Sequence, residues 1–150
     1  SFTSYYMVDK LYEASRAGVQ IQLIVRGICC LIPGVPGMSE HIEAISIVDK
    51  FLEHPRVFIF GNEGNPLVYI SSADWMTRNI ENRVEVGCPI YDPHVKQELI
   101  DTFEISWSDN VKGRLLVDTQ QSPYRNNGSA PVRSQYALYE YYQKKLSESN

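Results

Sequence analysis

The chain has 150 residues, of which 43% are hydrophobic and 21% are charged, and its formal net charge is −4 at pH 7. This length and composition are sufficient for one globular domain with its own core. The negative charge argues against non-specific binding to nucleic acid, which requires a basic surface. Any polyanion must therefore be bound by a local cluster of cations.

Other features of the composition bear on where the protein works. No apolar run reaches the ~20 residues that a membrane-spanning helix needs, and residues 1–6 lack the features of a signal peptide. The three cysteines are an odd number and include the adjacent pair Cys29–Cys30, which forms no zinc-binding pattern. We therefore expect reduced thiols and a cytoplasmic protein. Because the chain also begins without methionine, we expect it to be a fragment of a longer protein.

The first third of the chain predicts a helix, then a strand and then a loop. Apolar residues recur at helical spacing over 7–17. Residues 19–25 alternate in polarity and then become wholly apolar, which is typical of a strand that enters a covered sheet. The segment 28–37 contains turn-forming prolines and glycines, and 42–52 favours a strand that runs into a short turn of helix. This order indicates an α/β layered domain.

The rest of the chain predicts a hairpin, followed by further strands and helices. Residues 56–60 and 67–71 are expected to be its two strands, joined by a turn rich in glycine and asparagine. Asp92 and Pro93 are typical of an N-cap and a first helical residue. In chain order we expect a strand over 83–86, a helix over 93–107, a strand over 112–117, a polar loop over 120–131 and a helix over 134–146. No linker or repeat divides the chain, so residues 1–150 should form a single domain.

Polar and charged side chains gather where several of these strands end. Arg26 follows the strand over 19–25, and Ser72 and Asp74 follow the second strand of the hairpin. Ligands of α/β sheets tend to bind beyond the carboxyl ends of strands, so these side chains can face one crevice. His54 precedes a strand, and it reaches the same edge only if that strand pairs antiparallel.

These residue types suit phosphorus chemistry. The imidazole of a histidine can transfer a proton near neutral pH, and guanidinium groups bind phosphoryl oxygens through paired hydrogen bonds. A purely structural interpretation stays open beside this one. In it, His54 bonds to the backbone in a turn before Pro55, and Arg26 caps carbonyl groups at a strand end. Asp74, Arg78 and Glu85 would then form an ion-pair network.

The order of these residues resembles one half of a phospholipase-D-like fold. His54 and Arg56 stand where that superfamily has a His-x-Lys pair, and Ser72 and Asp74 stand where it has Ser-x-Asn. Longer segments are similar to the carboxy-terminal domain of bacterial polyphosphate kinase of the first type, namely residues 11–31, 46–54, 69–79, 83–89 and 109–114. The expected fold is therefore α/β, a single phospholipase-D-like half with a mixed β-sheet flanked by helices. Residues 1–6 depart from the family's opening strand, which we expect to be missing or altered.

The resemblance implies a function for the full-length enzyme. It would transfer the terminal phosphate of ATP reversibly to inorganic polyphosphate, with Mg²⁺. Arg26 corresponds to the arginine of the family's Val-Arg-Gly motif, which holds ATP phosphates, and His54 corresponds to a second catalytic histidine beside the nucleotide. Arg56 and Ser72 are weaker candidates for binding ATP or phosphate. The phosphorylated histidine and the magnesium ligands of this family belong to the preceding domain, so we expect no metal ligands here and no activity of the fragment alone.

The implied partners are ATP or ADP, inorganic polyphosphate, the preceding catalytic domain of the same chain and further copies in a homo-oligomer. Arg125 and Arg133 are candidates for guiding polyphosphate, with salt-dependent binding expected by analogy with nucleic acids. The alternative is that both are solvated surface arginines. A stripe of Tyr136, Tyr139, Tyr142 and Leu146 at helical spacing predicts a docking face.

Two other functions stay open. A phosphodiesterase half-domain of the phospholipase-D type would need no nucleotide, so ATP or ADP would leave its melting temperature unchanged. A non-catalytic phosphate-binding or oligomerisation module would tolerate substitution of His54 in the whole enzyme. The direction of the reaction in the cell and a membrane association of the full-length enzyme are also left open.

Overall fold

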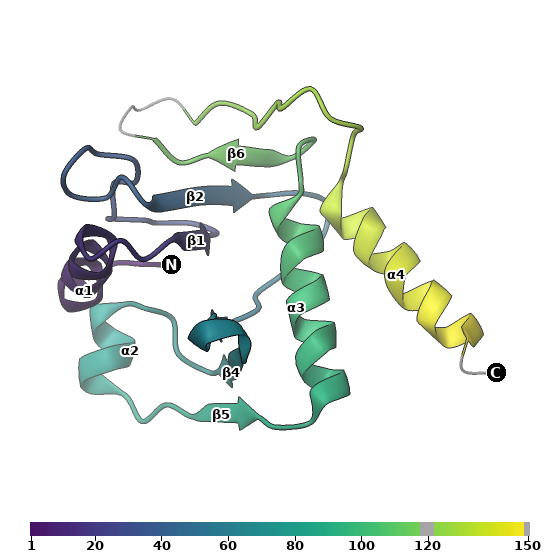
Figure 1. Ribbon diagram of the computed structural model, residues 1–150, viewed down its shortest axis with the longest axis horizontal. Coiled ribbons are helices and arrows are strands. Elements are labelled where there is room, and N and C mark those ends of the chain that lie inside the picture. Colours follow the sequence, from purple (N-terminus) through teal and green to yellow (C-terminus); the bar gives the residue numbers. More distant parts are fainter. Residues whose placement is uncertain (118–121, 149–150) are drawn as a thin grey trace.

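The computed structural model describes residues 1–117 and 122–148, which form helices and small β-sheets (Figure 1). The elements in chain order are α1 (Tyr5–Arg16), β1 (Ile21–Ile24), β2 (Ile42–Ile47), β3 (Val57–Phe60), the 3-10 turn η1 (Asn62–Gly64), β4 (Leu67–Ser71), α2 (Thr77–Asn82), β5 (Gly87–Ile90), α3 (Pro93–Trp107), β6 (Gly113–Leu115) and α4 (Ser134–Glu148). This arrangement confirms the expected α/β class.

The described strands are divided between two three-stranded sheets. The first sheet has the order β1-β2-β6, in which β1 and β2 are parallel and β6 is antiparallel to β2. The second sheet has the order β3-β4-β5 and is antiparallel throughout. The predicted hairpin is therefore confirmed as β3 and β4. The mixed sheet expected from the sequence corresponds to the first of the two sheets.

Three details differ from the expected secondary structure. The strand expected over 83–86 is wrong, because β5 begins only at Gly87 and Val84 is fully exposed with no neighbouring strand. After β2 the chain continues as a loop through residue 56 rather than as a turn of helix. Helix α2 was not expected, since its single apolar residue, Ile80, gives no helical periodicity.

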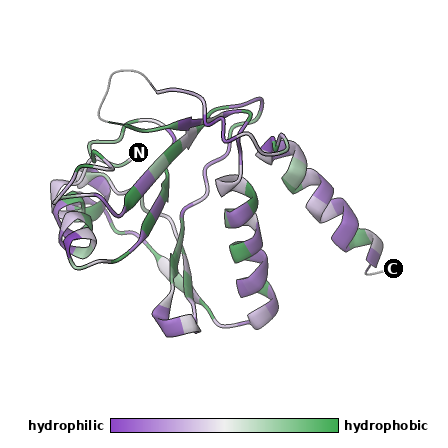
Figure 2. Cartoon of the chain, turned by 45° about the horizontal axis from the view of Figure 1, so that its top comes forward, coloured by the Kyte–Doolittle hydropathy of each residue, from purple (hydrophilic) through white to green (hydrophobic). Residues whose placement is uncertain are grey.

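The carboxy-terminal half otherwise follows the sequence pattern. Asp92 caps α3 by accepting hydrogen bonds from the backbone amides of His94 and Val95, with Pro93 as the first helical residue. The polar loop expected over 120–131 lies partly outside the described residues. Helix α4 packs beside α3 and extends away from the sheets (Figure 2). No helix of the described residues is long and apolar enough to cross a membrane.

The amino-terminal residues join the two sheets. The amide of Phe2 donates to the carbonyl of Ile28 at 2.8 Å, and its carbonyl accepts from the amide of Cys30 at 2.9 Å. On the other side, the amides of Thr3 and Ser4 donate to the carbonyl of Trp75. The Phe2 side chain is also part of the main core cluster, which consists of Phe2, Val8, Val25, Leu31 and Ile42. This segment therefore holds the loop after β1 next to the segment after β4.

A buried carboxylate joins the ends of three elements. Asp109, which follows α3, is fully buried. Its Oδ1 atom accepts hydrogen bonds from the amides of Val111, Lys112 and Gly113 at 2.7–3.0 Å, at the start of β6. Its Oδ2 atom accepts from the amide and the hydroxyl of Ser134 at 2.8 and 2.7 Å, at the start of α4. Burial alone would raise the pKa of Asp109, but the hydrogen bonds from Ser134 and the backbone lower it.

We expect Asp109→Asn to destabilise the chain. The amide keeps the shape of the side chain, but its NH₂ group must replace one of two acceptor oxygens that face only donors. Leaving buried donors unpaired should lower the free energy of unfolding by about 2–4 kcal/mol at pH 7. Urea denaturation measures this change, and the exposed Asp9→Asn of α1 is the matched control, with an expected change below about 0.5 kcal/mol.

Comparing wild type with Asp109→Asn at different pH values gives a second test. The pKa of Asp109 is lower in the folded chain than in the unfolded chain, where it is ~3.9. The stability from its charge is therefore present above that value and is lost as the pH falls through the folded pKa. The difference between wild type and Asp109→Asn should shrink below about pH 4. A difference that stays constant down to about pH 2 would contradict this account.

Candidate functional site

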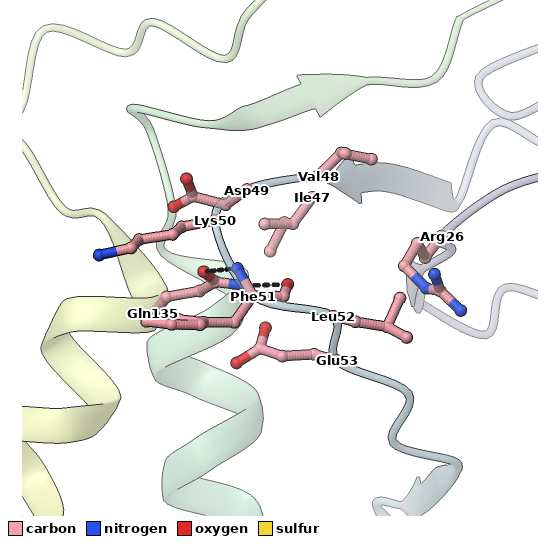
Figure 3. A pocket seen from close by; sticks show the side chains of 9 residues that line it. All are labelled: Arg26, Ile47, Val48, Asp49, Lys50, Phe51, Leu52, Glu53 and Gln135. Atoms are coloured by element: carbon pink, nitrogen blue, oxygen red, sulfur yellow. Dashed lines mark hydrogen bonds between the residues drawn. The ribbon is translucent and has the colours of Figure 1, made fainter.

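A shallow pocket of ≈ 260 Å³ lies where the parallel strands β1 and β2 end. Arg26, which follows β1, forms one side of it, and Gln135 of α4 forms the other (Figure 3). Residues 47–53, from the last residue of β2 onward, line the space between these two side chains. The position of Arg26 at the carboxyl edge of the parallel strands agrees with the sequence-based expectation.

Arg26 brings an unsatisfied cation to this pocket. Its side chain is partly buried, and its Nε atom is buried without a hydrogen-bond partner in the described part of the chain. A buried N–H group without an acceptor is costly, so such groups are rare in folded proteins. Exposed apolar side chains lie next to it, since Val48 is 69% exposed and Leu52 is 80% exposed. Because the Nε atom is closed off from solvent, a phosphate oxygen in the pocket would reach it only after a small movement of the side chain or its neighbours.

Residues 49–51 form the wall of the pocket between Arg26 and Gln135. They have no regular secondary structure, but side chains at and just before the start of α4 hold them in place. Gln135 accepts from the amide of Phe51 at 2.9 Å and donates to the carbonyl of the same residue at 2.8 Å. Arg133 binds both carboxylate oxygens of Asp49, at 2.7 and 2.6 Å. The hydrogen bond from Arg133 lowers the pKa of Asp49, against the opposite effect of burial. These contacts hold residues 49–51 in one conformation.

A second cluster surrounds Asp74. Its Oδ1 atom lies 3.1 Å from Nε2 of His54 and accepts from Nε of Arg56, also at 3.1 Å. The amino group of Ser1 lies 3.8 Å from the same oxygen. The Asp74 side chain is only 13% exposed, whereas that of His54 is 43% exposed. Burial by itself would raise the pKa of Asp74, but the hydrogen bonds from Arg56 and His54 lower it.

His54 can reach the end of β4 only if the strand that follows it pairs antiparallel with β4, and this pairing is present. Strand β3 pairs antiparallel with β4, and the amide of Ser71 donates to the carbonyl of Arg56 at 2.9 Å. The start of β3 therefore lies beside the end of β4, where Asp74 follows. This local geometry brings His54 to Asp74, at the end of the hairpin where the sequence pattern placed both.

Arg26 and His54 come from different sheets and share no hydrogen bond within residues 1–117 and 122–148. Arg26 lines the pocket, whereas His54 turns to Asp74. Two observations connect the sites. Glu53, which lines the pocket, directly precedes His54. Ser1 lies 3.8 Å from Asp74, and its Oγ atom would be 3.3 Å from a Cβ atom added at Gly27, next to Arg26.

Ser72 belongs to a third polar group. Its hydroxyl donates to Oε2 of Glu85 and accepts from the amide of Val86 at 3.0 Å. Oε1 of Glu85 accepts from the side-chain amide of Asn79 at 2.7 Å, and the hydrogen bonds from Ser72 and Asn79 lower the pKa of Glu85. The alternative ion-pair network of Asp74, Arg78 and Glu85 is not seen in the described residues, because both carboxylates have other partners.

The two arginines proposed to guide polyphosphate have contacts inside the chain. Arg125 donates to the carbonyl of Trp107 and lies 4.8 Å from the centroid of its ring. Arg133 binds Asp49 and lies 4.6 Å from the ring centroid of Tyr136. A role of Arg125 and Arg133 with polyphosphate stays a prediction.

The chemistry of a divalent metal does not fit the side chains present. In residues 1–117 and 122–148, no three His, Cys, Asp or Glu side chains lie close enough together to hold a metal ion. Mg²⁺ is usually bound through carboxylates and phosphate oxygens. These residues alone therefore do not form a site for a divalent metal ion.

Residues 1–135 match a family model described as polyphosphate kinase C-terminal domain 2. The chain belongs to this family. It is 54% identical over 136 residues to the polyphosphate kinase of Vibrio parahaemolyticus and 51% identical over 136 residues to that of Escherichia coli K12. Each alignment covers 90% of this chain but only 20% of the relative. The polyphosphate kinase domain thus spans about one fifth of the length of the curated relatives that it matches.

A solved structure gives the same result for the fold. The crystal structure of polyphosphate kinase from Porphyromonas gingivalis superposes with a TM-score of 0.94 at 44% identity. The superposition covers 98% of this chain and 23% of that one. The resemblance to polyphosphate kinase inferred from the sequence is therefore confirmed, and so is the fold that it implied.

Sequence reasoning missed two contacts that organise the site. Asp74 was expected at the crevice or in an ion-pair network with Arg78 and Glu85, but not as the shared partner of His54 and Arg56. The alternating pattern of strands, which places residues 54 and 56 on one side, could have indicated such a partner. Gln135 had no detectable signal, because it lies 84 positions from the Phe51 backbone that it binds.

We expect Gln135→Leu to loosen the pocket wall. The substitution removes the acceptor for the amide of Phe51 and the donor to its carbonyl. Amide hydrogen exchange at Phe51 should become at least about tenfold faster, since the lost bonds are worth ~1–3 kcal/mol when buried. Gln143→Leu on the exposed part of α4 is the control. Unchanged exchange at Phe51 would show that Gln135 does not fix the wall.

Proposed function

We propose that this domain supplies Arg26 and His54 to the ATP and phosphate site of a polyphosphate kinase. The whole enzyme transfers the terminal phosphate of ATP reversibly to inorganic polyphosphate. Membership of the family supports the reaction, and one observation supports the site. Arg26, whose Nε atom lacks an acceptor in the described part of the chain, lines a pocket whose wall leads directly to His54.

Arg26 stabilises negative charge during the transfer. A nucleophile from the preceding domain attacks the terminal phosphorus of ATP while the bond to the ADP oxygen breaks. Charge on the transferred and leaving oxygens is stabilised by fixed cations, and a guanidinium fork matches two such oxygens. Arg56 is the weaker second cation, because its Nε atom already binds Asp74. Ser72, which is engaged with Glu85, is a weak phosphate ligand at most.

His54 protonates the leaving oxygen or orders the phosphoryl group. When the bond between phosphorus and the ADP oxygen breaks, a proton from the imidazole can neutralise that oxygen, and the reverse step returns it. The side chain is 43% exposed on the open side of its cluster, so a nucleotide can approach it. Histidine suits this task, since its ordinary pKa lies near neutral pH.

The rest of the site comes from outside this domain. The partners are ATP or ADP, polyphosphate, the preceding catalytic domain and further copies of the whole enzyme. Mg²⁺ would be bound by the preceding domain together with the nucleotide phosphates. The isolated chain is therefore expected to be inactive, and polyphosphate synthesis by this chain alone would overturn the division of the site.

Replacing His54 by alanine in the full-length enzyme should abolish most of the synthesis of polyphosphate. Losing a general acid commonly costs ~10²–10⁴ in rate, and the exposed side chain contributes little to stability. The measurement is kcat for polyphosphate synthesis, accompanied by the melting temperature. His94→Ala, at the exposed start of α3, is the control. Near-normal turnover of His54→Ala would remove His54 from the mechanism.

Replacing Arg26 by lysine tests the second residue. Lysine retains the charge but cannot hold two oxygens in the fixed geometry of a guanidinium. We expect kcat/KM for ATP to fall by about 10². Arg16→Lys, in the exposed last turn of α1, should leave it unchanged. If Arg26→Lys also has the wild-type value, the pocket is not where the nucleotide phosphates bind.

A further inference from the structure

We propose that Asp74 is a positioning residue that orients His54 together with Arg56. This inference rests on the proposed function of His54. Asp74 acts through its neighbours and is not itself expected to touch the substrate. The observation that carries it is the single Oδ1 atom that contacts both cationic side chains at 3.1 Å.

The local backbone explains why both side chains reach one oxygen. Residues 54–56 form no helix and lead directly into β3, and side chains two positions apart in an extended segment point to the same side. Pro55 lies between them and restricts the backbone, because its ring fixes one dihedral angle. His54 and Arg56 thus form a pair with a common orientation, and Asp74 lies opposite that pair.

Asp74 is itself held firmly. The Trp75 ring that follows it stacks on Phe58 of β3, with centroids 5.1 Å apart, and packs against Phe2 at 5.3 Å. The backbone of Trp75 accepts hydrogen bonds from the amides of Thr3 and Ser4. On the other side, the buried Ala73 donates its amide to the hydroxyl of Ser71. A carboxylate anchored in this way can define the positions of more mobile side chains.

The charge of Asp74 matters as well as its position. A hydrogen bond to a charged carboxylate is roughly twice as strong as one between neutral groups. The phospholipase-D-like pattern has a neutral asparagine at this place, which would hold His54 less firmly. The other charged groups around His54 are Glu53, Arg56, and Glu85 near Arg56.

The contact leaves Arg56 able to bind a phosphoryl oxygen. Asp74 engages only the Nε atom of Arg56, so the two terminal guanidinium nitrogens lie outside this hydrogen bond. Asp74 therefore joins an acid and a cation into one unit that faces the incoming phosphate. Losing Asp74 should affect turnover more than the binding of ATP. Arg26, the proposed ligand of the ATP phosphates, lines a pocket that Asp74 does not line.

The test compares Asp74→Asn, Asp74→Glu and Asp9→Asn in the full-length enzyme. We expect Asp74→Asn to lower kcat about tenfold, less than loss of the acid itself, with a smaller change in KM for ATP, because a neutral amide oxygen is a weaker acceptor than a carboxylate. Asp74→Glu keeps the carboxylate and should recover most of the lost kcat. Asp9→Asn, at an exposed position of α1, should match wild type.

The possible results separate this inference from the proposed function. If Asp74→Asn keeps the wild-type kcat while His54→Ala is inactive, the inference fails and the proposed function stands. Equal losses in kcat and in ATP binding, or no recovery of kcat in Asp74→Glu, mean a structural role only, which also overturns the inference. If His54→Ala is active, the proposed function fails first. Should Asp74→Asn fold poorly, kcat of Asp74→Glu decides, and a value far below that of wild type counts against the inference.

Discussion

The carboxylate of Asp109 is the constraint on which the rest of the structure depends. It accepts five hydrogen bonds in a fully buried position and thereby fixes where α3 ends, where β6 starts and where α4 starts. Ser134, one of its partners, lies between Arg133 and Gln135, the two side chains that bind the pocket wall. The orientation of the wall next to Arg26 is thus set by a charge that lies outside the pocket. A surface loop can be rigid when its anchors are buried.

The candidate site is built at the junction of two small sheets. Arg26 comes from the end of a parallel strand in the first sheet, and His54, Arg56 and Asp74 come from the paired ends of a hairpin in the second. Neither sheet alone carries both groups. This division suits a reaction in which one set of cations holds phosphates while a separate acid works on the leaving oxygen. The family of the chain, polyphosphate kinase C-terminal domain 2, is consistent with such chemistry.

The parts that the sequence predicted are those with local determinants. The start of α3 follows from Asp92 and Pro93, and the hairpin follows from two apolar runs joined by a glycine-rich turn. The contacts that shape the site connect distant positions, such as Gln135 with Phe51 and His54 with Asp74. No periodicity encodes such pairs. The Val-x-Val pattern of residues 84–86 suggested a strand for the opposite reason, since a local pattern existed but, within the described residues, its backbone bonds to the segment after β4 only at Val86, while Val84 is fully exposed.

The placement of Phe2 has a practical consequence for work with this domain. Its backbone is bonded on one side to the loop after β1, and the residues that follow it are bonded to Trp75 on the other side. The first few residues therefore connect the two halves that carry Arg26 and His54. Removing residues 1–4 would break both sets of bonds, whereas α4 points away from both sheets and takes no part in this connection.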